Sequence, residues 1–266
     1  MKTLVIDCGA TKADWYVSGG RTLRTAGFNL AHTPAAQLTA LLDEASAAIG
    51  AVDRVHLYAA GLVEKPPVDL ERWFPGASVE YASDMVGAAR AVCGREPGIA
   101  AILGTGANTC LWDGERIVRK VNCGGFIIGD EGSAAVLGRL FVTDYLKGFV
   151  PESMAQAFAA QFPADYPSIV HEVYAGAAPA RYLGAFAPLI LSFYASEEYA
   201  RDLVERNFRG FFERTVLQYD PLPLGVVGGF GYACREILQR LGAECGVRFS
   251  TFLKSPVEGL VRYHAL

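Results

Sequence analysis

The sequence lacks the usual marks of zinc-binding, nucleic-acid-binding and membrane proteins. Its six cysteines form no Cys-x-x-Cys pair, and no histidine stands near them at a zinc spacing. No dense Lys/Arg run occurs and the formal net charge is −4, so nucleic acid and anionic membrane are poor partners. The first apolar run stops at Asp7, and the longest later one, around residues 185–195, is too short to span a bilayer. We expect a soluble, cytoplasmic protein with reduced thiols that binds a small molecule.

Two common nucleotide-binding motifs are also absent. The chain has no Gly-x-x-x-x-Gly-Lys-Ser/Thr stretch and no Gly-x-Gly-x-x-Gly that opens a helix, which excludes the P-loop and dinucleotide folds. Its 266 residues are 52% hydrophobic and 20% charged, enough for a sizeable core in one large domain or two smaller ones.

One local pattern occurs twice along the chain. Residues 3–20 and 99–114 each read as a strand, a Gly/Thr turn, a second strand and a tight hairpin. Apolar residues recur at helical spacing at 35–49, 188–199 and 203–217. Alternating strands and helices predict the α/β class, with one sheet in each half.

The repeat also predicts two lobes. No Ser/Gly-rich linker separates the halves, so the repeat alone places the boundary near Trp112. We therefore expect an N-terminal lobe at 1–112 and a C-terminal lobe at 113–253.

Three glycine-rich turns follow predicted strands, at Gly9, at 104–106 and at 228–231. Such turns leave backbone N–H groups free to bind an anion, and small residues let a phosphate come close. A single turn of this kind is typical of a tight connection. Three together favour a phosphate site.

Two aspartates at predicted strand ends have both a chemical and a structural interpretation. Asp7 precedes Thr11 and Lys12, and its carboxylate could hold Mg²⁺ through water while the Thr hydroxyl and the turn amides face phosphates. Alternatively, Asp7 accepts hydrogen bonds from its own turn. Asp84 follows Ser83, and either residue could be the cap of the next helix. Alternatively, Asp84 is a general base for an acceptor hydroxyl.

The segment 123–133 has four glycines and two adjacent acids before a predicted helix. An exposed loop would normally avoid the apolar residues 126–128. A sugar-recognition loop combines such an apolar platform with carboxylates for hydroxyl groups. The alternative is a buried connection in which Asp130 or Glu131 caps the next helix.

The chain resembles the N-acetylglucosamine kinase branch of the sugar kinase, actin and heat-shock chaperone superfamily. The resemblance is carried, in chain order, by residues 5–12, Asp84, 102–108, 129–133 and 227–229. The resemblance spans nearly the whole chain, and Gly-Asp-Glu-Gly-Ser at 129–133 is its most specific part. It implies two ribonuclease H-like lobes, the actin-like ATPase fold, with a cleft between them. It further implies that the C-terminal residues 254–266 return to the first lobe as a helix.

The same resemblance implies an ATP-dependent kinase that uses Mg²⁺ and phosphorylates an N-acetylated amino sugar at its C6 hydroxyl, with Asp84 as catalytic base. The implied phosphate contacts are Asp7, which is also the metal-binding residue, Gly9, Thr11, Lys12, Gly104, Thr105 and Gly106. The implied adenosine contacts are Gly228 and Gly229. The implied sugar contacts are Asn29, Asp84, Asn108, Gly124, Gly125 and Asp130.

Some positions depart from the family pattern. Cys8 and Ala10 stand where the family usually has glycine, and Phe126 stands where many members carry tryptophan. The acceptor therefore stays open among N-acetylglucosamine, N-acetylmuramic acid, glucosamine and related hexoses. The sequence also leaves open whether the chain is a monomer or a homodimer.

A rival interpretation comes from the same superfamily branch, which contains ATPases that activate 2-hydroxyacyl-CoA dehydratases and benzoyl-CoA reductases through an iron–sulfur cluster. Their cluster-binding segment, a Cys followed by small residues and Gly-Thr-Gly, is not present here. A nucleotide-binding sensor without turnover is a third interpretation, which the presence of Asp7 and Asp84 weakens.

Overall fold

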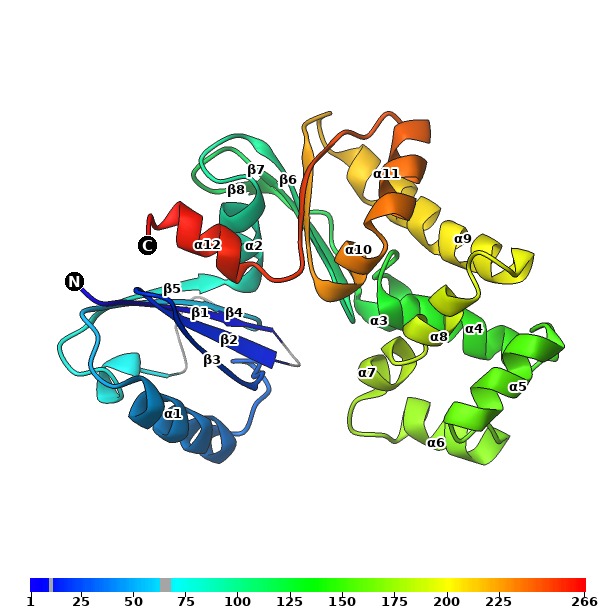
Figure 1. Cartoon of the computed structure of the whole chain (residues 1–266), viewed down its shortest axis with the longest axis horizontal. Coiled ribbons are helices and arrows are strands. Elements are labelled where there is room, and N and C mark those ends of the chain that lie inside the picture. Colours follow the sequence, from blue (N-terminus) through cyan, green and yellow to red (C-terminus); the bar gives the residue numbers. More distant parts are fainter. Residues whose placement is uncertain (10–11, 63–67) are drawn as a thin grey trace.

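The computed structural model describes residues 1–9, 12–62 and 68–266 and consists of two lobes, each built on one five-stranded sheet (Figure 1). The first sheet has the strand order β3-β2-β1-β4-β5. Its strands are β1 (Thr3–Cys8), β2 (Lys12–Val17), β3 (Arg21–Ala26), β4 (Arg54–Ala59) and β5 (Ser78–Ser83). The second sheet has the order β10-β9-β6-β7-β8. Its strands are β6 (Gly98–Leu103), β7 (Ala107–Trp112), β8 (Ile117–Arg119), β9 (Leu224–Val227) and β10 (Phe249–Leu253).

The two sheets share one topology. In each, the central strand, β1 or β6, pairs antiparallel with the next strand of the chain and parallel with a later strand, β4 or β9. The buried central strands are continuous apolar runs, as expected of strands covered on both faces. The predicted α/β class and the predicted repeat of strand, turn, strand and hairpin are thus confirmed.

The boundary between the sheets lies earlier than the sequence pattern placed it. Strands β6 and β7 precede Trp112 or end on it, yet they form the centre of the second sheet. The reason is non-local, because β6 obtains its parallel partner β9 from residues 224–227, far along the chain. The chain therefore divides near Gly98 rather than near Trp112.

Helices cover both sheets. In and beside the first lobe lie α1 (Ala35–Ile49), η1 (Leu70–Arg72), α2 (Asp84–Val92) and α12 (Val257–Tyr263). The second lobe carries α3 (Gly125–Ile128), α4 (Ala134–Tyr145), α5 (Glu152–Gln161), α6 (Tyr166–Tyr174), α7 (Pro179–Gly184), α8 (Ala187–Ser192), α9 (Glu198–Arg214), η2 (Val216–Gln218), α10 (Gly229–Ala233) and α11 (Arg235–Glu244). The helices expected at 188–199 and 203–217 are shifted, because a turn at 193–197 separates α8 from α9.

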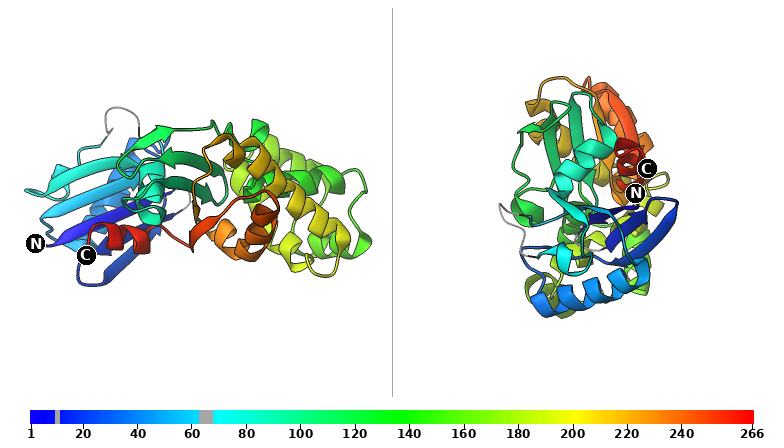
Figure 2. Two further views of the ribbon diagram at one scale, coloured as in Figure 1. Left: turned by 90° about the horizontal axis from the view of Figure 1, so that it is seen from above. Right: turned by 90° about the vertical axis from the view of Figure 1, so that its left-hand side faces the viewer.

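A shared apolar cluster joins the lobes. Helix α2 contributes Met85, Ala88 and Ala89, which pack with residues of both sheets and with Leu260 of α12. The chain crosses between the lobes on either side of this cluster, after α2 and again before α12. Helix α12 thus returns to the first lobe, where both termini lie (Figure 2). Among the described residues, no helix is long and apolar enough to cross a membrane.

Candidate active site

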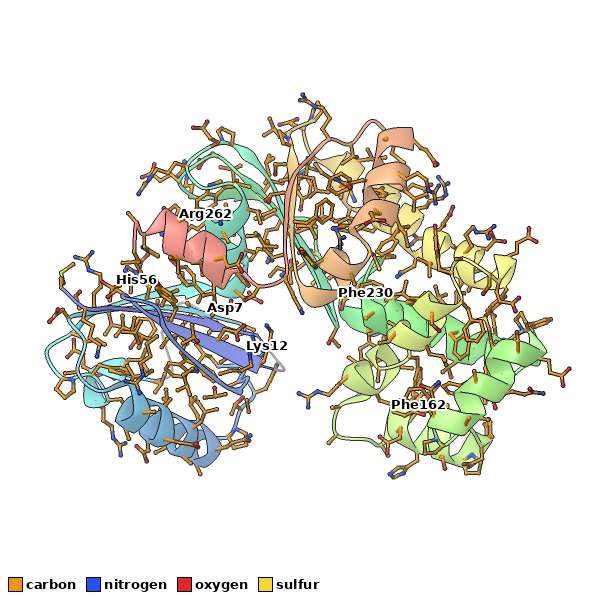
Figure 3. All side chains as sticks on the ribbon, in the orientation of Figure 1. Asp7, Lys12, His56, Phe162, Phe230 and Arg262 are labelled. Atoms are coloured by element: carbon orange, nitrogen blue, oxygen red, sulfur yellow. The ribbon has the colours of Figure 1, made fainter. Side chains whose placement is uncertain are left out.

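A cleft of about 530 Å³ collects most of the predicted phosphate-binding residues from both lobes. The three glycine-rich turns meet there because each follows the carboxyl end of one of the strands β1, β6 and β9. The predicted site residues that line the cleft are Asp7, Gly9, Lys12, Asp84, Gly104, Thr105, Gly228 and Gly229. Figure 3 labels Asp7 and Lys12 on the first lobe and Phe230 on the second. Thr11, predicted to bind phosphate, lies outside the described residues.

Asp7 is a largely buried carboxylate near the end of β1. It stands directly opposite Asp14 in the antiparallel pair of β1 and β2. Burial raises the pKa of Asp7 to about 7; the charges of Asp14 and Asp84 raise it too, whereas Lys12 lowers it. Lys12 extends beside these acids, with its Nζ 2.7 Å from Asp14 Oδ2. Excess negative charge of this kind suits a bound cation.

Asp84 is the first residue of α2 and is not the cap of that helix. Ser83 is the cap, since its Oγ accepts a hydrogen bond of 3.2 Å from the Val86 N–H. The Asp84 carboxylate lines the cleft and accepts a hydrogen bond from the Met85 N–H at 2.8 Å. Burial raises its pKa, opposed by the Met85 bond and the charge of Lys120. A raised pKa suits a carboxylate that must accept a proton near neutral pH.

Two predicted sugar contacts, Asn108 and Asp130, line a separate small cavity together with Cys123. Asp130 has a φ of 56°, an uncommon conformation for a residue with a side chain. Its carboxylate packs against the second phosphate turn so closely that a Cβ on Gly106 would lie 2.9 Å from Asp130 Oδ2. The pKa of Asp130 is raised, mainly by burial. The turn at Gly106 therefore separates this cavity from the cleft.

The remaining predicted sugar contacts lie outside both cavities. Asn29 is on the first lobe, where its side chain fills the space beside Gly61 and accepts a hydrogen bond from the Ala31 N–H at 2.9 Å. Gly124 and Gly125 begin the short helix α3 on the second lobe. The structure thus brings most of the predicted phosphate contacts together but distributes the predicted sugar contacts over two lobes.

The sequence analysis missed one wall of the cleft. Ala187, Pro188 and Leu191 of α8 line it, together with Phe230 and Ala233 of α10. Their apolar pattern resembles that of an ordinary core helix, so only the fold distinguishes them. An apolar wall of this kind fits an aromatic base better than a phosphate.

The full length of the chain can be compared with solved structures. A protein from Porphyromonas gingivalis, described as a putative N-acetylglucosamine kinase, is 34% identical over 98% of both chains, with a TM-score of 0.89. This chain belongs to the N-acetylglucosamine kinase-like family of sugar kinases. It is an ATP-dependent kinase with the two-lobed actin-like ATPase fold.

More distant structures show the fold alone. A protein from Chromobacterium violaceum, also described as a putative N-acetylglucosamine kinase, is 21% identical over 98% of both chains, with a TM-score of 0.72. A glucokinase from Streptomyces griseus, solved with glucose and AMPPNP, is 17% identical over 99% of this chain and 98% of its own, with a TM-score of 0.56. No protein-family model and no curated protein matches this kinase.

Proposed function

We propose that this kinase transfers the γ-phosphoryl group of ATP to the C6 hydroxyl of an N-acetylated amino sugar, either N-acetylglucosamine or N-acetylmuramic acid. The observation that carries the proposal is that Asp84, Lys12 and the three glycine-rich turns line one cleft. The name of the relative that is 34% identical supports the amino sugar as the acceptor class.

In the proposed reaction, Asp84 orients the C6 hydroxyl and takes its proton as the sugar oxygen attacks the γ-phosphorus. The new O–P bond forms as the bond to the β,γ-bridging oxygen breaks, and ADP leaves with that electron pair. The turn amides at 104–105 and the ammonium group of Lys12 bind the phosphates in place. The apolar wall at 187–191 and Gly228 and Gly229 hold the adenosine.

Asp7 is the residue proposed to hold Mg²⁺, through a bound water. Its carboxylate faces the cleft, is largely buried and lies near two other acids, so a divalent cation would offset an unfavourable concentration of negative charge. Bound there, Mg²⁺ would neutralise charge on the ATP phosphates.

We propose that sugar selectivity comes from the second lobe. Asn108, Asp130 and the backbone of Gly124 and Gly125 would bind hydroxyl groups and the N-acetyl group, and Asn29 would reach them from the first lobe. Beside them, α3 offers an apolar surface, since Ile127 is 67% exposed and Ile128 is 83% exposed. Apolar contact on one edge and acceptors on the other suit a polyol.

A screen of ATP consumption across amino sugars tests this proposal. We expect turnover with an N-acetylated sugar, poor turnover with glucose, and phosphate on C6 by ³¹P–¹H NMR of the product. If glucose were used as efficiently as every N-acetyl sugar, the proposed acceptor class would be wrong. The rival role, an ATPase that activates a dehydratase-type partner, is not favoured, because the 34% identical relative is named as a sugar kinase.

A further inference from the structure

Helix α9 buries a polar side chain that none of the proposed roles uses. Asn207 is 3% exposed, and its neighbours on the buried face of α9 are apolar, among them Val204, Phe208 and Phe211. Burying an amide is costly unless both of its halves form hydrogen bonds. A buried asparagine on an otherwise apolar helix face is therefore informative.

Both halves of the Asn207 amide bind the Gly-Asp-Glu-Gly-Ser loop. Its Oδ1 accepts a hydrogen bond from the Gly132 N–H at 2.9 Å, and its Nδ2 donates one to the Ser133 carbonyl oxygen at 3.0 Å. Neither partner belongs to α9. Asn207 therefore fastens this loop to a helix more than 70 residues away in the sequence.

The loop needs such a constraint because its backbone is strained. Asp130 has a φ of 56°, a left-handed conformation that is unfavourable for a residue with a side chain. Gly132 has a φ of 85°, and a Cβ at that position would lie 2.7 Å from Phe211 Cβ. The α9 face formed by Asn207 and Phe211 thus holds the loop closely in one conformation.

The clamped loop connects the two parts of the proposed active site. Asp130 packs against Gly106, and the Ser133 N–H donates to the Asp130 carbonyl oxygen at 3.0 Å. Just beyond the loop, the N–H groups of Ala134 and Ala135 donate to the carbonyl oxygens of Gly104 and Thr105 at 3.0 and 3.1 Å. The start of α4 is therefore tied to the phosphate turn directly. Asp130 is held by the loop and by its own N–H, which donates to the Cys123 carbonyl oxygen at 2.8 Å.

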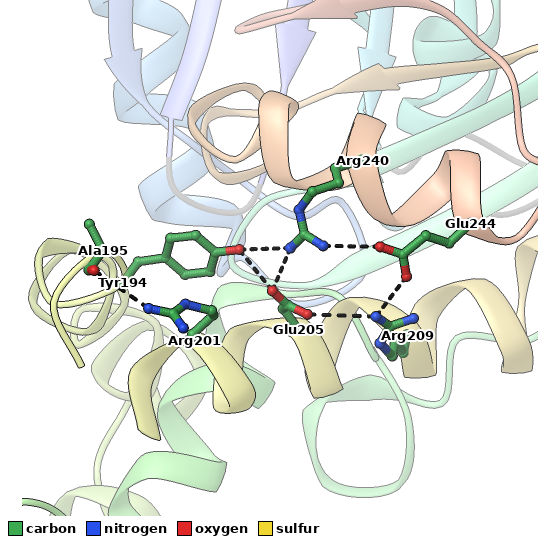
Figure 4. A network of polar contacts seen from close by, with 7 residues as sticks. All are labelled: Tyr194, Ala195, Arg201, Glu205, Arg209, Arg240 and Glu244. Atoms are coloured by element: carbon green, nitrogen blue, oxygen red, sulfur yellow. Dashed lines mark hydrogen bonds and ion pairs between the residues drawn. The ribbon is translucent and has the colours of Figure 1, made fainter. Parts of the chain in front are cut away.

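Helix α9 is itself held from its exposed side by a network of ion pairs (Figure 4). Arg240 of α11 pairs with Glu205 of α9, and Arg209 of α9 lies 2.8 Å from Glu244 of α11. The Tyr194 hydroxyl donates to Glu205 at 3.0 Å. Networks of this kind restrain a helix more than isolated surface pairs do.

We propose that Asn207 is a positioning residue for the sugar site: by fixing Gly132 and Ser133, it sets the place of Asp130. This inference rests on the proposed function, since it assigns Asp130 to the sugar. The effect is expected on the sugar more than on ATP, because the phosphate turn has its own hydrogen bonds to α4.

The test uses Asn207→Leu, which removes both hydrogen bonds and keeps the number and branching of the side-chain heavy atoms. Val204→Ala is the matched control, since Val204 is a buried residue of the same helix. We expect Asn207→Leu to raise the KM for the sugar about tenfold, with the KM for ATP changed less than threefold. Val204→Ala should lower thermal stability without separating the two KM values. Equal KM changes for sugar and ATP in Asn207→Leu, or none, would overturn the proposal.

An activity-independent measurement separates this inference from the proposed function. Hydrogen exchange followed by mass spectrometry should show faster exchange at 129–133 in Asn207→Leu than in Val204→Ala. Wild-type protein that turned over no N-acetyl sugar would contradict the proposed function alone, while the exchange result would still decide whether Asn207 fixes the loop. An unchanged exchange rate at 129–133 in Asn207→Leu would refute the proposal that Asn207 fixes this loop.

Discussion

The substitution Asp84→Asn separates catalysis from folding. It keeps the size of the side chain and an oxygen that can accept the Met85 hydrogen bond, but it removes the ability to accept a proton at neutral pH. General-base catalysis typically contributes about 10²- to 10⁴-fold. At 1.36 kcal/mol per decade, we expect kcat to fall by that factor, a loss of about 3–5 kcal/mol of transition-state stabilisation.

The stability of Asp84→Asn should not fall together with its kcat. Because burial raises the pKa of Asp84, its ionised form is disfavoured in the folded protein, so a neutral asparagine should leave the melting temperature unchanged or raise it. The matched control is Ser83→Ala, which removes the true helix cap. It should cost about 1 kcal/mol of stability and leave kcat within about threefold of wild type.

Steady-state kinetics and thermal melts of both variants decide the matter. A kcat for Asp84→Asn within about threefold of wild type would remove Asp84 from the mechanism. A loss of stability in Asp84→Asn equal to that of Ser83→Ala would show instead that the carboxylate has a structural role.

Three further predictions concern Asp7, the closure of the two lobes and His264. Asp7→Ala should abolish turnover while sugar binding, measured by calorimetry, stays nearly intact; wild-type activity at low Mg²⁺ would leave Asp7 as a turn residue. Sugar plus a non-hydrolysable ATP analogue should bring the lobes together and lower the radius of gyration, and identical scattering curves would contradict a hinged cleft. Burial and the nearby His56 lower the pKa of His264 to about 4, so stability should be full above about pH 6.5 and fall between pH 6.5 and 4. In His264→Gln the melting temperature should fall less over that range, and an identical fall would assign the acid sensitivity to other groups.

Local sequence patterns predicted the strand, turn and hairpin unit that occurs in both sheets. Helix α1 has the bounds 35–49 that its apolar spacing indicated, and the strand, turn and hairpin units occur where the sequence placed them. The lobe boundary could not be found in this way, because the assignment of β6 to a sheet depends on pairing with β9. Pairing between remote segments leaves little trace in a local pattern.

The limits of helix prediction have a similar cause. Phe193, Tyr194 and Tyr199 all pack against the core of the second lobe, so apolar spacing continues through the turn that separates α8 from α9. In the candidate site, too, some residues could be identified from local sequence and others could not. Residues in the strand-end turns were identifiable one by one, whereas Pro188 and Asn207 gain their meaning only from segments far away in the sequence.

The apolar cluster around α2 and α12 is the joint between the two lobes. A rotation of the lobes about this joint would account for the separation of the predicted sugar contacts, while the predicted phosphate contacts lie together. Asp84 begins α2, the helix whose residues pack with both sheets, and it lines the cleft together with Lys254 and Ser255 of the second chain crossing. Rotation about such a joint moves groups near it least and groups far from it most. The proposed closure would therefore leave Asp84 close to the phosphate turns and carry Asn29 of the first lobe toward the α3 platform of the second. On this account the sugar site is completed only by closure, which excludes water at the moment when Asp84 must take the proton from the sugar instead.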